Sequence, residues 1–123
     1  MAVSTPVTEQ RAFGLLVDGD QLFLSVLQRV LCRRRIETFA ATSTDSALRL
    51  PTVSHLDFAL VDLNLQMSSH PKLAESLRQR YPGIRLILMI DREDIQTNVA
   101  GGGTISYLPK AMNIDALLRA LAV

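Results

Sequence analysis

Three aspartates and one lysine each follow a run of apolar residues, and this pattern could support chemistry on a charged group. Asp18, Asp62 and Asp91 come directly after three such runs, and Lys110, one of two lysines in the chain, comes just after a fourth. Clustered carboxylates repel one another unless a cation joins them, and Mg²⁺ fits that requirement with one or two carboxylates plus water. A lysine beside them would bind an added anion such as a phosphoryl group. The pattern therefore predicts a phosphoryl-handling site, provided that the fold brings the four residues together.

The apolar runs themselves indicate buried strands separated by helices. Strands are predicted over residues 13–17, 36–40, 58–61, 84–90 and 104–108. Apolar residues at spacings of three and four, with capping and stop residues, predict helices over 22–31, 43–50, 71–80, 94–100 and 113–121. The first of these helices is expected to bury an apolar face that includes Leu22 and Val26. The stretch 66–70 is expected to be a loop.

Five strand–helix repeats imply a parallel sheet covered on both faces. We predict a flavodoxin-like three-layer α/β/α sandwich whose five parallel strands lie in the order 2-1-3-4-5. In such a sheet, ligands bind at the carboxyl ends of the strands near the point where the strand order reverses. Turns also favour Asp, which would explain any one aspartate taken singly. Three aspartates and a rare lysine at one edge favour the functional interpretation.

Length, composition and charge limit the other possibilities. The 123 residues fit one domain, and 48% hydrophobic with 20% charged residues is an ordinary globular composition. A net charge of +1 argues against direct nucleic-acid binding, and no apolar run reaches the roughly 20 residues that span a bilayer. The single cysteine, Cys32, excludes an internal disulfide and is expected to be buried. Residues 1–10 are interpreted as a flexible leader to a cytoplasmic domain over 11–123, because they are polar and carry no secretory signal.

Three short segments at the ends of predicted strands carry a further signal. Residues 15–20 read Leu-Leu-Val-Asp-Gly-Asp, residues 59–65 read Ala-Leu-Val-Asp-Leu-Asn-Leu, and residues 107–110 read Tyr-Leu-Pro-Lys. They resemble the acidic turn, the phosphoacceptor strand and the aromatic–lysine pair of the response-regulator receiver domains, the CheY-like superfamily of two-component signalling. The second segment is also similar to the ActR/RegA-type regulators.

The resemblance implies a signalling domain rather than an enzyme, with a role for each residue of the site. Asp62 would accept a phosphoryl group from a sensor histidine kinase, and Lys110 would pair with that group. Asp18, Asp62 and the backbone carbonyl of Asn64 would hold Mg²⁺. Tyr107 would report the switch, although a half-buried strand tyrosine needs no switching role. The implied partners are the kinase, a downstream output domain or protein, and a second copy bound through the last helices, with no direct nucleic-acid or membrane contact.

The site departs from the family pattern and is interpreted as degenerate. Gly19 stands where the family has a second acid, which weakens Mg²⁺ binding, and Asp20 is a possible but unassumed substitute one position further on. Ile90 lacks the family's hydroxyl, so that switch hydrogen bond is lost. Asp91 replaces a small residue; either it pairs with Lys110 in place of a phosphoryl group, or it faces solvent and caps the next helix.

These departures leave a second hypothesis open. The chain would then be a pseudo-receiver that acts without phosphorylation, as a module for protein–protein contact or dimerisation. Mg²⁺-dependent phosphorylation distinguishes the two hypotheses.

Overall fold

The computed structural model describes residues 12–68, 72–90, 105–111 and 113–121. The predicted leader over residues 1–10, the helix expected over 94–100, and Asp91 lie outside the described residues.

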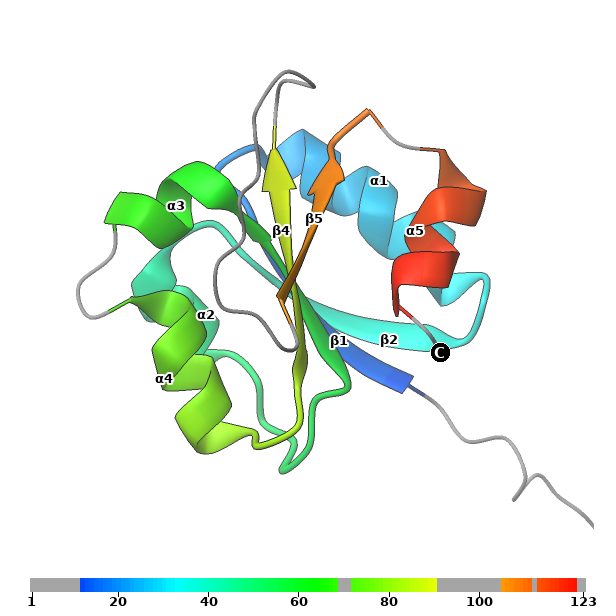
Figure 1. The fold of residues 1–123 in the computed structure, drawn as a ribbon. Coiled ribbons are helices and arrows are strands. Elements are labelled where there is room, and N and C mark those ends of the chain that lie inside the picture. Colours follow the sequence, from blue (N-terminus) through cyan, green and yellow to red (C-terminus); the bar gives the residue numbers. More distant parts are fainter. Residues whose placement is uncertain (1–11, 69–71, 91–104, 112, 122–123) are drawn as a thin grey trace, which may run out of the picture.

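A five-stranded parallel sheet forms the middle layer, with helices on both faces (Figure 1). Its strands, in chain order, are β1 (Ala12–Val17), β2 (Ile36–Ala41), β3 (Phe58–Asp62), β4 (Arg85–Ile90) and β5 (Ile105–Pro109). The order across the sheet is β2-β1-β3-β4-β5, and all neighbouring pairs are parallel. This confirms the predicted fold class and strand order.

The helices divide between the two faces of the sheet. They are α1 (Gln21–Cys32), α2 (Thr44–Arg49), α3 (Leu63–Ser68), α4 (Leu73–Arg80) and α5 (Ile114–Leu121). Helices α1 and α5 lie on one face, and α2, α3 and α4 lie on the other (Figure 1). Because successive side chains of a strand point to opposite faces, β1 sends Leu15 and Val17 into one cluster and Leu16 into the other.

Two details of the helices differ from the sequence prediction. Leu22 and Val26 are 74% and 53% exposed, because α1 turns Leu24, Leu27 and Leu31 toward the sheet instead. The prediction that Leu22 and Val26 would be buried is therefore wrong.

The second difference is α3, which occupies residues 63–68 where the sequence analysis placed the start of a loop. Neither Pro nor Gly interrupts these residues, so a helical turn can form directly after β3. Leu63 and Leu65 are partly buried and pack against the core, which holds this short helix on the sheet.

Gly14 is required by a close approach within the sheet. It pairs with Phe58 of β3, and a Cβ built at Gly14 would lie 2.1 Å from Cζ of the Phe58 ring. The phenylalanine ring therefore fills the space that any larger residue at position 14 would need.

Candidate functional site

Three of the four residues singled out from the sequence meet at the carboxyl edge of the sheet. Asp18 follows β1, Asp62 ends β3, and Lys110 follows β5. The ammonium Nζ of Lys110 lies 2.7 Å from Asp18 Oδ2 and 2.7 Å from Asp62 Oδ1. The side chains of the two aspartates are 3% and 11% exposed, against 21% for the lysine. One ammonium therefore joins two nearly buried carboxylates.

The lysine is held in place by its backbone and by an aromatic ring. Its N–H donates to the carbonyl oxygen of Ile90, at 2.8 Å, which extends the pairing of β4 and β5 by one residue. Nζ also lies 5.5 Å from the centre of the Phe23 ring on α1, within the range of a cation–π contact.

The charge of Lys110 is strongly favoured at this position. Burial on its own lowers the pKa of Lys110, but hydrogen bonds and charge attraction from Asp18 and Asp62 together raise the pKa above its ordinary value. The site therefore contains a permanent cation at neutral pH.

The two oxygens of Asp18 have different surroundings. Oδ1 accepts a hydrogen bond from the backbone N–H of Asp20, at 2.9 Å. Oδ2 is fully buried and lies 2.7 Å from the ammonium of Lys110, which balances its charge. A buried carboxylate oxygen that already faces a cation is suited to ligating one, so Asp18 fits Mg²⁺ in place of the ammonium.

The side chain of Asp20 serves the helix that follows it. Its Oδ1 accepts from the backbone N–H groups of Leu22 and Phe23, at 3.1 and 3.2 Å, and thereby caps the amino terminus of α1. The structure thus directs Asp20 to the helix and does not bring it to the Asp18–Lys110 cluster. At Gly19 an added Cβ would meet no atom of the described residues within 4 Å, so among them there is space for a second acid.

Asp62 is the residue that links the site to α3. While Oδ1 faces Lys110, Oδ2 accepts a hydrogen bond from the backbone N–H of Leu65, at 3.2 Å. Asn64 lies inside α3, and helical carbonyls point toward the carboxyl end of their helix. The carbonyl of Asn64 therefore points away from Asp62 in this conformation and is not brought to the carboxylates.

The remaining candidates lie near the edge but contribute no polar group to the cluster. Ile90 ends β4 and is 6% exposed, so its position beside Lys110 is apolar. Tyr107 is partly buried and packs against the core cluster that includes residues of α4. This position agrees both with a switch residue and with an ordinary strand tyrosine. Among the described residues, no three His, Cys, Asp or Glu side chains gather closely enough to hold a metal ion. Of the described residues, Asp18 and Asp62 are the ones that could hold a metal here.

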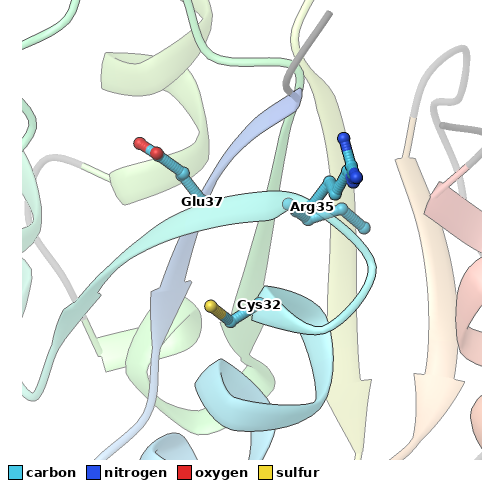
Figure 2. A pocket seen from close by; sticks show the side chains of 4 residues that line it. Cys32, Arg35 and Glu37 are labelled. Carbon is cyan, nitrogen blue, oxygen red and sulfur yellow. The ribbon is translucent and has the colours of Figure 1, made fainter. Parts of the chain in front are cut away.

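A separate hollow lies at the other end of α1 (Figure 2). It has a volume of about 310 Å³ and is lined by Cys32, Arg35, Ile36 and Glu37. Cys32 is exposed there, so the prediction of a buried thiol is wrong. Since β2 begins at this end, the hollow lies away from the carboxyl edge that carries the site.

The chain belongs to the response regulator receiver domain family, whose model matches residues 15–122. This confirms the resemblance seen in the three sequence segments. Within the described residues, no helix is both long and apolar enough to cross a membrane.

Curated relatives extend beyond the matched region. The transcriptional regulatory protein DegU of Brevibacillus brevis is 29% identical over 121 residues, which cover 95% of this chain and 51% of DegU. The photosynthetic apparatus regulatory protein RegA of Rhodobacter capsulatus is 29% identical over 109 residues, covering 87% of this chain and 59% of RegA. The chain thus spans between half and three-fifths of the length of these two relatives.

Solved structures show the same fold. A signal receiver domain of an HD domain-containing protein from Pseudomonas fluorescens Pf-5 matches with a TM-score of 0.74 and 28% identity, over 92% of this chain and 93% of that one. A response regulator from Burkholderia pseudomallei, described with a phosphorylated aspartic acid, a calcium ion and citrate, matches with a TM-score of 0.70 and 27% identity. That match covers 89% of this chain and 66% of the other.

Proposed function

We propose that Asp62 accepts a phosphoryl group from the phosphohistidine of a sensor histidine kinase. The observation that carries this proposal is the ammonium of Lys110 at 2.7 Å from Asp62, at the edge of the sheet where ligands bind. A carboxylate oxygen of Asp62 attacks the phosphorus, the P–N bond of the phosphohistidine breaks, and the imidazole leaves with the bonding electrons. The phosphorylated aspartic acid described in the Burkholderia pseudomallei relative supports this role.

Mg²⁺ is the proposed metal, held by the carboxylates of Asp18 and Asp62. When bound, such a cation neutralises charge on the group being transferred. The buried Oδ2 of Asp18 supports this assignment, and water would fill the remaining ligand positions. Lys110 has to leave at least one of the two carboxylates for the metal to bind. The carbonyl of Asn64 joins them only if the first turn of α3 opens.

Signalling by such a domain requires partners. We propose that a sensor histidine kinase supplies the phosphoryl group in the cytoplasm, and that an output domain or protein responds to it. A second copy bound through the last helices is a further candidate partner. The curated relatives support the output role, because they are regulatory proteins longer than the region they share with this chain. We take residues 11–123 as the signalling unit and residues 1–10 as its leader.

A pseudo-receiver is the second candidate, and one contact favours it. Lys110 already joins Asp18 and Asp62, so a cation is present without metal. In that case the domain would bind its partner in a fixed state, and Asp91 would stand in for the phosphoryl group beside Lys110. Replacing Asp91 with Ala would then change partner binding or dimerisation, and unchanged binding and dimerisation would contradict this role.

Intact mass after incubation with acetyl phosphate and Mg²⁺ tests the phosphoacceptor proposal. Acetyl phosphate supplies the phosphoryl group directly, so the cognate kinase is not needed. We expect one added phosphoryl group on the parent protein and none on Asp62→Asn. No addition to a protein whose circular dichroism shows an intact fold would overturn the proposal in favour of the pseudo-receiver.

A further inference from the structure

Asp62 is also the amino-terminal cap of the helix that follows it. Its Oδ2 accepts from the N–H of Leu65, which is the third residue of α3. This is the hydrogen bond by which an N-cap aspartate satisfies one of the free N–H groups of a helix. The proposed phosphoacceptor and the start of α3 therefore share one carboxylate.

The other end of α3 is joined to the start of α4. Lys72, the N-cap of α4, makes no side-chain cap hydrogen bond. Instead, Gln66 of α3 accepts a hydrogen bond from the N–H of Ala74 through its Oε1, at 2.9 Å. The Nζ of Lys72 donates to the carbonyl oxygen of Met67, at 2.8 Å. Residues of α3 thus supply part of the capping that α4 lacks locally.

We propose that these contacts form a relay from Asp62 through α3 to the amino terminus of α4. The relay rests on the proposed function, because phosphorylation of Asp62 is the event that it transmits. Phosphorylation on Oδ1 leaves Oδ2 as a neutral carbonyl oxygen, which is a weaker acceptor than a carboxylate. Phosphorylation on Oδ2 removes the present acceptor altogether. In both cases the relay has the phosphoryl oxygens pair with Lys110 rather than with the N–H of Leu65. The cap on α3 then weakens, and the contacts of Gln66 and Met67 with α4 loosen.

The composition of α3 makes it sensitive to the loss of this cap. The helix has six residues, none of them fully buried, and no acidic residue in its first turn. Helices this short are marginal without support from outside. Met67 is 62% exposed, so opening of the helix would change a surface that a partner can reach. The apolar Ile90 adds to the case, since it cannot make the family's switch hydrogen bond on β4.

Amide hydrogen exchange measured by NMR, with phosphorylation followed by mass in the same sample, tests the relay. After treatment with acetyl phosphate and Mg²⁺, we expect the N–H of Leu65 to exchange roughly fivefold faster, the ratio that corresponds to loss of a typical N-cap hydrogen bond. The N–H of Ala74 should accelerate as well. The N–H of Leu60, in the middle of β3, is the internal control and should stay unchanged. A phosphorylated protein with unchanged exchange at Leu65 and Ala74 overturns the relay and leaves the phosphoacceptor role standing.

A matched pair of variants tests the cap without any phosphorylation. Asn is as good an N-cap as Asp, whereas Ala provides no acceptor. We therefore expect faster exchange at Leu65 in Asp62→Ala than in Asp62→Asn, although both variants lose the carboxylate that faces Lys110. Equal rates at Leu65 in the two variants would refute the cap, whatever the outcome of the phosphorylation assay.

A second pair of variants tests the contact between α3 and α4. Gln66→Ala removes the acceptor for the N–H of Ala74, whereas Gln66→Glu keeps one. We expect faster exchange at Ala74 in the alanine variant only, with Leu65 unchanged in both, because the cap on α3 lies upstream of Gln66. Unchanged exchange at Ala74 in Gln66→Ala would show that α3 does not support α4.

Discussion

Replacing Lys110 with Met should destabilise the fold, because it leaves two nearly buried carboxylates without their shared cation. Removing one partner of a buried ion pair costs about 3–5 kcal/mol. The lysine side chain is 21% exposed, whereas the two aspartates are 3% and 11% exposed. Solvent screening at the lysine reduces the cost, so we expect a loss of about 2–3 kcal/mol in the free energy of unfolding.

Urea denaturation followed by circular dichroism measures this loss. Lys72→Met is the matched control, since it removes the other lysine of the chain, whose exposed Nζ donates to the carbonyl oxygen of Met67. Surface substitutions of this kind change stability by about 0.5 kcal/mol or less. If Lys110→Met is no more destabilising than Lys72→Met near neutral pH, the reasoning about the buried carboxylates is refuted.

Adding Mg²⁺ and varying the pH test the prediction for Lys110→Met in two further ways. In Lys110→Met the released carboxylates should bind Mg²⁺ more readily, so Mg²⁺ should stabilise the variant more than the parent; a concentration ten times the dissociation constant adds about 1.4 kcal/mol. The pKa of Lys110 is raised in the folded protein. Its stabilisation is therefore fully present below the ordinary lysine pKa of about 10.4 and is lost as the pH rises through the higher folded value. The gap between the unfolding free energies of parent and variant should stay constant from neutral pH to about pH 10.4 and shrink above it.

Three other substitutions test separate parts of the account. Gly19→Asp places a carboxylate where an added Cβ meets no atom of the described residues within 4 Å. It should tighten Mg²⁺ binding on the order of tenfold by calorimetry, and Gly19→Asn should give a smaller gain because it adds no charge. Asp20→Ala should lower the free energy of unfolding by about 1 kcal/mol through loss of the α1 cap, and the Mg²⁺ dissociation constant should stay unchanged. A larger dissociation constant in this variant would show that Asp20 binds the metal. Gly14→Ala should cost about 1–3 kcal/mol, since its Cβ would lie 2.1 Å from the Phe58 ring, and a double variant with Phe58→Leu should cost less than the sum of the two single changes.

The strands and their order were predictable because each strand is a continuous apolar run. A strand buried on both faces carries that pattern in its own residues, and parallel order then brings its carboxyl end to the common edge. The meeting of Asp18, Asp62 and Lys110 follows from topology alone. The joining of both carboxylates by one ammonium does not, because it depends on side-chain reach across the sheet.

The two errors in α1 and the missed helix α3 have local physical causes. Spacings of three and four fit several overlapping faces of one helix, so periodicity could not decide between Leu22 and Leu24 as the buried residue. Residues 66–70 were assigned to a loop although they contain neither Gly nor Pro. That same absence permits a helix, and Asp62 just before Leu63 is a favoured N-cap residue, so the signal was present in the sequence.

Asp62 therefore has to meet three demands with two oxygens. Oδ1 neutralises Lys110 and Oδ2 caps α3. Under the proposed function, one of the two must also become the nucleophile toward phosphorus. Metal binding draws on the same oxygens, and the carbonyl of Asn64 becomes available only when the first turn of α3 opens. Binding of Mg²⁺ and opening of α3 should thus favour each other, because reciprocal coupling is a thermodynamic necessity. Gly19 stands in place of a second acid, and the side chain of Asp20 caps α1. This chain should therefore couple its metal to α3 more tightly than a receiver with two adjacent acids would.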